Sequence, residues 1–407
     1  MKNSYDVIIV GAGPSGSSAA MFLGKAGKNV LLLDRSKFPR DKTCGDGISG
    51  KSTRVLRELG LLEGMKTIEA QPMTGVTFSS PDGTVAPIES RNKNKDSPPG
   101  YVCRREVFDN FLFENAKKHC KTIEEFMVTN LLRKDGKVVG VVGTDIKTKQ
   151  DHVFRAPLVL GADGVGGITA RELGVFNDRE DHVCSAIRGY YDNVEGMIDQ
   201  IELHFIDGVL PGYFWIFPLP NKTANVGIGM LVKDMKKKKV NLSKLLEDTI
   251  QNNPKFKDRF KGSKRISPIK GWSLPLGSER PKPYADGILL LGDAASLIDP
   301  FTGEGIGNAL ISGKIASQVA LKAFEKNDFS EKTLSEYDSL IKEECDSELK
   351  TSYNLQKMVN HRFLLNFVVH KAAYSPFAKD YLSKTLLDPE KQRSFENPLF
   401  YLRLLTS

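Results

Sequence analysis

The chain has 407 residues, which is too long for one ordinary hydrophobic core, so we expect two or three domains. Apolar residues make up 40% of it and charged residues 27%, a balance typical of a soluble globular protein that excludes a disordered one. The formal net charge of +8 favours anionic partners, such as nucleotide phosphates, lipid diphosphates or a membrane surface. No nucleic-acid-binding motif accompanies the charge, so we expect no nucleic-acid partner.

Cysteine and histidine usage argues against structural cross-links. The five cysteines are scattered without a C-x-x-C pair, and the six histidines lack ligand spacing, so we expect neither disulfides nor a metal. The first strand begins by Asp6, which leaves no room for a signal peptide, and no stretch has the roughly 18 apolar residues of a membrane span. We therefore expect a cytoplasmic protein. Peripheral contact with the inner face of the membrane is an open alternative, and the run Lys236–Lys239 is either a solvated helix end or part of that contact.

The N-terminal segment has the pattern of a βαβ unit. Val7–Val10 reads as a buried strand and runs into Gly11–Gly16, which has the spacing G-x-G-x-x-G. Ser17–Ala26 is compatible with a helix, and a second strand, Asn29–Leu33, follows it. It ends in Asp34, whose carboxylate can accept hydrogen bonds from the two ribose hydroxyls of an adenosine.

The glycines of this turn have separate roles. Gly11 permits the tight turn, Gly13 lets the backbone approach a pyrophosphate, and Gly16 lets the helix pack close to the strand. The phosphates would meet the free N–H groups and the positive dipole end of the helix that begins near Pro14 and Ser15. We therefore predict a dinucleotide cofactor, with an ordinary structural turn as the alternative.

The rest of the chain divides into alternating segments. We expect a loop over Ser36–Gly50, helices over Lys51–Leu62, Glu106–His119, Leu242–Asn252 and Ile306–Phe324, and only helices after Ser330. Hairpins are expected at Gly75–Ser80 with Thr84–Ile88 and at Glu124–Arg133 with Val138–Thr144, and buried strands at Leu158–Leu160 and Ile288–Leu291. Val183–Ile269 is mainly a strand pattern.

This order predicts an α/β fold. A Rossmann-like nucleotide-binding domain would hold an inserted, mainly antiparallel β substrate domain and be followed by a C-terminal helical region. The expected parts of the first domain are 1–75, 101–175 and 284–328, those of the insert are 76–100 and 176–283, and the helical region is 329–407.

Three glycine–aspartate stations, Gly11–Gly16, Ala162-Asp163-Gly164 and Gly292-Asp293, occur in this order together with Arg105. They resemble the FAD-dependent oxidoreductases of the p-hydroxybenzoate hydroxylase fold, and the resemblance implies FAD. It places Asp293 on the ribityl chain, with a helix N-cap as the alternative, and Arg105 near the phosphates, with Arg104 as its competitor. The further cofactor residues that it implies are Arg35, Cys44, Gly45, Asp163, Gly164, Pro300, Gly303, Gly305 and Ile306. The last four precede or open the long helix, where backbone N–H groups would face the N1–C2 edge of the flavin; a structural turn is the alternative.

Two further stretches look like the geranylgeranyl reductase group of that superfamily. Cys44-Gly45-Asp46-Gly47 matches its cysteine–glycine loop beside the flavin ring, and Tyr213-Phe214-Trp215-Ile216-Phe217-Pro218 matches its Y-x-W-x-F-P signature. Strand alternation puts Tyr213, Trp215 and Phe217 on one face, as an apolar wall for an isoprenoid chain or simply as core. The alternative for Cys44 is that it is an ordinary small buried residue without a role in catalysis.

The resemblance implies a reductase of C=C bonds in geranylgeranyl or polyprenyl chains, which takes hydride from N5 of reduced FAD. Cys44 and Tyr213 are the candidates for the proton donor, Trp215 is grouped with them as catalytic, and the wall of Tyr213, Trp215 and Phe217 would bind a polyprenyl lipid or diphosphate. The electron donor is NAD(P)H or reduced ferredoxin. Alternatives are a monooxygenase or halogenase that acts on an aromatic substrate, and a flavoprotein sensor or lipid-binding module.

Overall fold

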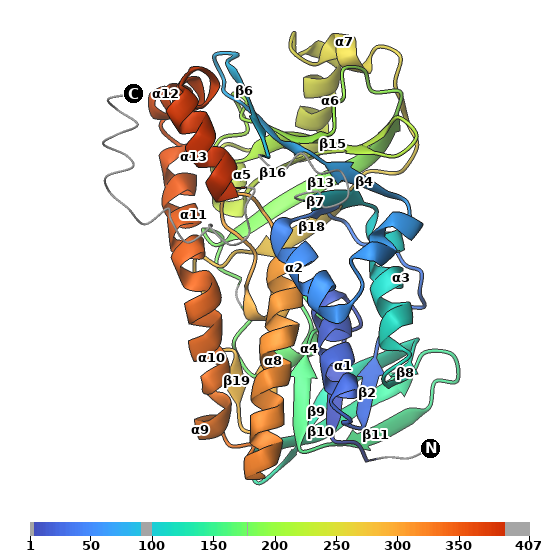
Figure 1. Cartoon of the computed structure of the whole chain (residues 1–407). Coiled ribbons are helices and arrows are strands. Elements are labelled where there is room, and N and C mark those ends of the chain that lie inside the picture. The colour runs from blue at the N-terminus through green and yellow to red at the C-terminus, as the bar shows by residue number, and fades with distance from the viewer. Residues whose placement is uncertain (1–3, 91–99, 177, 387–407) are drawn as a thin grey trace.

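Two large sheets organise the chain, as the computed structural model shows (Figure 1). The structure describes residues 4–90, 100–176 and 178–386. The lower sheet in Figure 1 carries helices and the N-terminal glycine turn, the upper sheet is mainly antiparallel, and a column of C-terminal helices runs along one side of both.

The first sheet has six strands in the order β19-β20-β12-β1-β2-β8. The strands are β1 (Val7–Val10), β2 (Val30–Leu33), β8 (Lys121–Ile123), β12 (Leu158–Gly161), β19 (Tyr284–Ala285) and β20 (Ile288–Leu290). All neighbours pair in parallel except β19, which is antiparallel to β20. The central strands are buried over their whole length, because parallel sheets are covered on both faces and need continuous apolar runs.

Helices next to this sheet bring the glycine turn into place. They are α1 (Pro14–Lys25), α2 (Gly50–Leu59), α3 (Arg105–Ala116) and α8 (Ile306–Lys326). Helix α1 begins at Pro14, where the phosphate-binding end of the helix was expected, since proline suits the first turn of a helix. Helix α8 packs along α1, and Gly313 allows the close approach: a Cβ there would lie 2.3 Å from the Ser15 carbonyl oxygen.

The second sheet has eight strands and is the predicted antiparallel unit. Its order is β17-β13-β16-β15-β14-β5-β6, and β18 also pairs with β13. The strands are β5 (Gly75–Ser79), β6 (Val85–Glu89), β13 (Val183–Asp192), β14 (Gln200–His204), β15 (Tyr213–Leu219), β16 (Thr223–Leu231), β17 (Lys264–Arg265) and β18 (Lys270–Pro275). Only β5 and β14 pair in parallel, which the long connection between them permits.

Smaller elements complete the two units. Two three-stranded sheets are β11-β10-β9 and β3-β7-β4, formed by β3 (Gly47–Ile48), β4 (Ala70–Met73), β7 (Gly100–Cys103), β9 (Phe126–Lys134), β10 (Lys137–Asp145) and β11 (Asp151–Arg155). The shorter helices are α4 (Ile168–Glu172), α5 (Val232–Lys237), α6 (Leu242–Asn252), α7 (Lys257–Phe260) and the 3₁₀ turns η1 (Glu63–Thr67) and η2 (Gly292–Ala295).

The described part of the chain after Ser330 is helical, as predicted. The helices are α9 (Glu331–Leu334), α10 (Glu336–Ile341), the π-helical turn η3 (Lys342–Asp346), α11 (Ser347–Met358), α12 (Arg362–Tyr374) and α13 (Pro376–Leu386). They climb from the first sheet to the β6 edge of the second, where α12 contacts β6 (Figure 1).

The structure corrects several element boundaries. The helix expected over Lys51–Leu62 ends at Leu59, because Gly60 takes the left-handed conformation and caps it. The helix expected from Glu106 begins one residue earlier, at Arg105, and the loop Ser36–Gly50 contains the short strand β3. The lysine run lies at the exposed C-terminal end of α5 and just after it, and its possible contact with a membrane stays a prediction. The predicted division into domains remains a prediction, and its segments 1–75, 76–100, 176–283 and 329–407 include positions outside the described residues.

We predict that Gly313→Val destabilises the fold. The added side chain meets backbone atoms of α1, so the two helices must separate, at a cost of about 1–3 kcal/mol or more. Gly262→Val is the matched control, because a Cβ at Gly262 has no neighbour within 4 Å. Urea unfolding of both variants measures the difference, and equal stabilities would contradict the close packing of α1 on α8.

Candidate functional site

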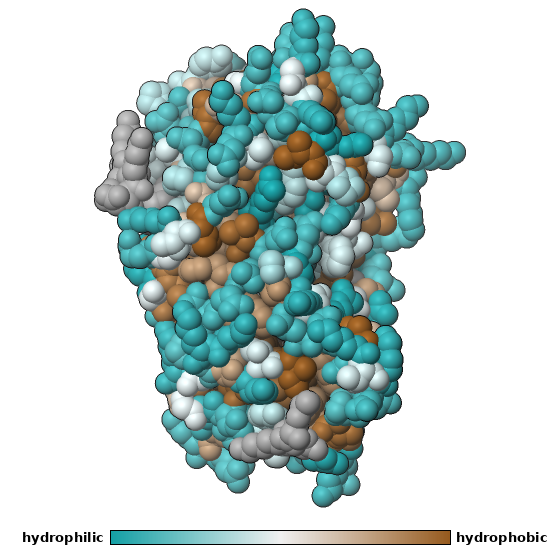
Figure 2. Space-filling model, turned by 90° about the vertical axis from the view of Figure 1, so that its right-hand side faces the viewer, coloured by the Kyte–Doolittle hydropathy of each residue, from teal (hydrophilic) through white to brown (hydrophobic). Residues whose placement is uncertain are grey.

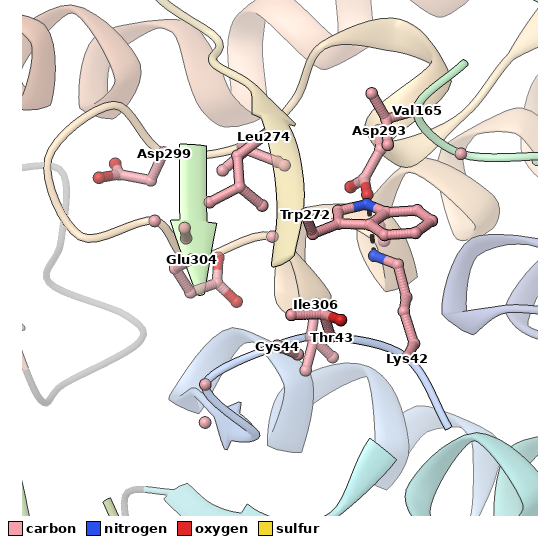
Figure 3. Close-up of a pocket in the computed structure, with 18 of the residues that line it drawn as sticks. Lys42, Thr43, Cys44, Val165, Trp272, Leu274, Asp293, Asp299, Glu304 and Ile306 are labelled. Carbon is pink, nitrogen blue, oxygen red and sulfur yellow. Dashed lines mark hydrogen bonds and ion pairs between the residues drawn. The ribbon is translucent and has the colours of Figure 1, made fainter. Parts of the chain in front are cut away.

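A cavity of about 820 Å³ lies between the two sheets. It includes the carboxyl ends of β1, β2 and β12, the edge of a parallel sheet where ligands generally bind. Its other walls come from the loops 40–51 and 299–306, the inner face of the second sheet, and α11 (Figure 3). Sequence segments that are far apart therefore meet around one space.

The glycine turn forms one end of this cavity. Gly11 has a φ of +102°, and a Cβ there would lie 2.3 Å from the Ala162 carbonyl oxygen; a Cβ on Gly16 would lie 1.8 Å from the Gly11 oxygen. Gly13 is open, with the Arg40 guanidinium 3.7 Å from its added Cβ as the nearest group. Gly13 caps α1 without a side-chain acceptor, so the first N–H groups of the helix can receive a phosphate. This geometry fits the pyrophosphate of a dinucleotide.

Asp34 lies beside the glycine turn and is 9% exposed. Its carboxylate accepts hydrogen bonds from the Ala12 N–H and the Ser36 N–H, both at 2.8 Å. These bonds fix the side chain at the cavity wall and leave lone pairs for a ribose. Arg35, the next residue, is exposed at the same wall.

A buried ion cluster distinguishes Arg105 from Arg104. Arg105 lines the cavity, is 3% exposed, and donates two 2.7 Å bonds to Asp109, which also pairs with Arg40. Burial alone would raise the pKa of Asp109, but Arg105 and Arg40 lower it, so the carboxylate stays ionised. Arg104 lies over the Tyr190 ring instead. Of the two arginines, Arg105 is the one at the cavity.

The two later aspartates behave differently from each other. Asp293 is the second residue of η2, whose N-cap is Leu291; its carboxylate faces the cavity and pairs with Lys42 at 3.1 Å (Figure 3). The N-cap alternative is therefore wrong for Asp293. Asp163 also lines the cavity, together with Gly164, but its carboxylate accepts hydrogen bonds from the N–H and hydroxyl of Thr169 and so holds α4.

The loop Asp299–Gly305 is tightly tied. One Asp299 oxygen accepts from the Phe301 and Thr302 N–H groups, and one Glu304 oxygen accepts from Gly307 N–H and the Ser49 hydroxyl. The second oxygen of each acid, Asp299 Oδ2 and Glu304 Oε2, is buried without a hydrogen-bond partner among the described residues. Pro300, Gly303, Gly305 and Ile306 line the cavity beside these orphaned atoms. Buried unpaired polar atoms are rare, so this loop has the character of a ligand site.

The aromatic strand β15 forms the roof. Tyr213, Trp215 and Phe217 face the cavity, while Phe214 and Ile216 enter the core on the other side of the sheet. A Cβ on Gly303 would lie 3.0 Å from the Tyr213 hydroxyl, and one on Gly45 would lie 3.0 Å from the Phe217 ring. The wall therefore contacts both loops that the family resemblance assigns to the flavin.

A buried hydrogen-bond network, which the sequence analysis missed, holds this wall in place. Asn225 Oδ1 accepts from the Trp215 indole at 2.9 Å, and its Nδ2 donates to the Cys44 carbonyl at 2.7 Å and to Asp46 at 2.8 Å. The Tyr190 hydroxyl also donates to Asp46. Asp46 was visible only as part of the Cys-Gly-Asp-Gly motif, and no sequence signal marked Asn225.

Three titratable side chains lie in this region, and they are Asp46, Tyr213 and Cys44. Burial raises the pKa of Asp46 to about 6, although Asn225 and Tyr190 donate to it. Burial also raises the pKa of Tyr213, and its hydroxyl donates to the Thr302 carbonyl. The Cys44 side chain is half-buried and faces the Arg105 guanidinium.

Comparison with known proteins identifies relatives over most of the chain. The FAD binding domain family matches residues 4–341. A digeranylgeranylglycerophospholipid reductase of Methanocaldococcus jannaschii is 34% identical over 367 residues, which are 88% of either chain, and one of Methanocella arvoryzae is 30% identical over 100% of this chain and 99% of its own.

Solved structures agree with the fold. A geranylgeranyl bacteriochlorophyll reductase-like protein from Thermoplasma acidophilum superposes with a TM-score of 0.83 and 26% identity, covering 97% of this chain and 99% of its own. The flavin-dependent brominase Bmp2 has a TM-score of 0.81 at 21% identity, covering 99% and 98%, and shows only that the fold is shared. The cofactor of this site is FAD.

We predict that Asp293→Ala weakens FAD binding. It removes a cavity-facing carboxylate and leaves Lys42 without its partner, which should cost about 1–3 kcal/mol and therefore raise the Kd of FAD about ten- to hundredfold. The ratio of flavin to protein absorbance after purification measures the loss. Asp286→Ala, on an acid outside the cavity lining, is the control; a full complement of FAD in Asp293→Ala would exclude the assigned role.

We predict that Asp46 makes stability depend on pH. Its folded pKa of about 6 lies above its ordinary value of 3.8, so its contribution is complete below about pH 4 and is lost as the pH rises through 6. The loss amounts to about 3 kcal/mol. Asp46→Asn stays neutral, so the stability difference between wild type and variant should change with pH in this window; parallel urea-unfolding curves from pH 4 to 7 would contradict the shift.

Proposed function

The chain belongs to the family of FAD-dependent oxidoreductases that contains the digeranylgeranylglycerophospholipid reductases, and from this premise we propose that it saturates C=C bonds in the geranylgeranyl or polyprenyl chains of lipids. The observation that carries the proposal is the wall of Tyr213, Trp215 and Phe217, which spans from the Gly303 loop to the Cys44–Gly47 loop inside one cavity. Reduced FAD, when bound, supplies the hydride for such a reaction.

The chain's own residues must hold an unactivated alkene and exclude water. Trp215 lies flat on β16, because the opposing Gly227 has no side chain: a Cβ there would lie 2.2 Å from the indole. Leu203 and Phe78 continue the apolar surface on the next strands. A flat, dry wall positions an isoprenoid chain without offering it a competing hydrogen bond.

The proton for the second carbon comes from a side chain at the wall. Tyr213 carries its phenolic proton at neutral pH and lies against the loop that orients the flavin edge in this proposal. Burial raises the pKa of Tyr213, so the carbon that accepts the proton must be strongly basic in the transition state. Cys44 is the second candidate, on the opposite loop beside Arg105.

We also propose that the electrons come from NAD(P)H or from a reduced ferredoxin-like protein. The G-x-G-x-x-G turn is occupied by FAD in this proposal, so a nicotinamide would bind without a second βαβ unit. A ferredoxin, which is acidic, would meet a chain with a net charge of +8.

Contact with a membrane surface is part of the proposal. No helix among the described residues is long and apolar enough to cross a membrane. Helix α12 nevertheless presents Phe363, 84% exposed, and Tyr374, 70% exposed, on the side away from its buried Leu365 and Val369. Arg362 and Lys371 lie on the same helix, so aromatic and basic groups could meet a lipid head-group layer together. Figure 2 draws the right-hand side of Figure 1, away from α12, and this face is mainly hydrophilic with scattered apolar patches.

The direct test is anaerobic. The holoenzyme is reduced with dithionite and mixed with a geranylgeranyl lipid, and mass spectrometry should find two added hydrogens for each reduced double bond. An unchanged lipid would overturn the proposal. A long-lived hydroperoxide absorbance on mixing reduced enzyme with oxygen, stimulated by an aromatic compound, would instead indicate a monooxygenase or halogenase.

We predict that Trp215→Ala retains FAD but loses at least about tenfold in kcat/KM on geranylgeranyl chains, because the flat wall is replaced by a gap. Trp215→Phe keeps an aromatic ring and loses only the N–H to Asn225, so its loss should be smaller. Steady-state reduction rates measure the loss of kcat/KM, and the flavin content of the purified variants shows whether FAD is retained. Equal rates in wild type and Trp215→Ala would move the substrate away from β15.

A further inference from the structure

The inner face of the second sheet changes from charged to apolar along one straight line. Hydrogen-bonded strand register places six residues opposite one another in succession, and they are Lys270, Arg188, Gly227, Trp215, Leu203 and Phe78. Directly opposed residues of neighbouring strands point to the same face. We call this line the transverse row. All of its members except Gly227 line the cavity.

Resting on the proposed function, we propose that the lipid lies along the transverse row, with its phosphate head group at Arg188, Lys270 and Trp272 and its prenyl chain running over Trp215 toward β5.

The charged end of the row holds more positive than negative charge. Arg188 is 1% exposed and donates to Asp41 at 2.6 Å, and Lys270 pairs with the other oxygen of Asp41 at 2.8 Å. Asp41 is thus shared by both cations, and the buried Asp46 attracts Arg188 from farther away without pairing with it. Lys42 lies next to them and is paired with Asp293. A bound phosphate would supply the missing negative charge.

Two buried donors at this end have no acceptor. Arg188 Nε and Trp272 Nε1 are both buried without a hydrogen-bond partner among the described residues, and both residues line the cavity. Trp272 is opposite Ala186, two positions along β13 from Arg188, so the two side chains share a face. Lys42 Nζ lies 5.8 Å from the Trp272 ring, and Figure 3 shows the lysine beside the indole. A phosphate oxygen can accept a hydrogen bond from a guanidinium or indole N–H of this kind.

The apolar end of the row fits a chain. Five inter-strand steps of roughly 4.8 Å separate β18 from β5, which gives about 24 Å of sheet face. Beyond Trp215 the cavity-facing residues are aliphatic or aromatic, and they are Leu203, Ile201, Phe78, Val76 and Met73. An extended chain of four isoprene units can lie across these strands with its head among the cations.

The head-group test compares two substrates that differ only in phosphate. With geranylgeranyl diphosphate, Lys270→Ala and Trp272→Phe should each raise KM about five- to tenfold, with little change in kcat. With geranylgeraniol, KM should stay within about twofold of wild type. Lys264→Ala, an exposed lysine on β17 outside the cavity lining, is the matched control.

Several results would overturn the placement. Equal KM changes for both substrates would show that the phosphate does not bind at this end of the row. Loss of FAD from either variant would show that Lys270 or Trp272 binds the cofactor instead. A raised KM for NADPH with an unchanged KM for the diphosphate would assign them to a nicotinamide donor.

Calorimetry separates this proposal from the reductase proposal. Inorganic pyrophosphate is titrated into wild-type holoenzyme and into Lys270→Ala, whether or not either reduces a lipid. Binding to wild type that weakens in the variant supports the head-group site, and no binding to wild type overturns it.

The far end of the row has its own test. Val76→Trp fills the cavity at β5, so it should abolish reduction of the twenty-carbon chain and spare the ten-carbon geranyl chain. Val85→Trp, at an exposed position of the neighbouring strand β6, controls for bulk. Undiminished turnover of the long chain by Val76→Trp would overturn the proposed direction.

Discussion

One buried amide joins the two halves of the cavity. Asn225 belongs to the second sheet, but its side chain donates to Cys44 and Asp46 in a loop of the first unit, while it accepts from Trp215 on the next strand. The amide is fully enclosed, so each of these bonds would be costly to lose. The distance between the aromatic roof and the Cys44 loop is therefore set by hydrogen bonds and not by loose apolar packing.

Glycines also shape the cavity, because they carry no side chain at positions where two surfaces touch. Gly16 and Gly313 bring α1 against its strand and against α8, while Gly45 and Gly227 let Phe217 and Trp215 lie against backbone. Hydrogen bonds thus tie the walls together at Asn225, and the missing glycine side chains let the walls approach closely at the other places. A flat ligand requires both conditions.

The sequence predicted the features that depend on neighbouring residues, but not the contacts between residues that are far apart in the chain. The apolar runs, the G-x-G-x-x-G turn and the alternation of Tyr213, Trp215 and Phe217 depend on neighbours in sequence, and the structure shows each of them. The parallel pairing of β5 with β14 depends on residues that are far apart in the chain, as does the meeting of Arg188 with Asp41. Asn225 shows the same limit: an asparagine in a strand gives no sign of its partners until the sheet has formed.

The C-terminal helices also protect the sheet. Strand β6 is an edge strand, and α12 lies against it while the Ser383 hydroxyl of α13 donates to the Glu89 carbonyl at 2.5 Å. An uncovered edge of this kind is a template for the strand of another molecule. Besides that bond to the edge, Leu365, Val369 and Ala372 of α12 share an apolar cluster with Ala86 and Ile88 of β6. A chain shortened before Arg362 would therefore expose an apolar face of this sheet together with its edge, and we expect such a chain to self-associate.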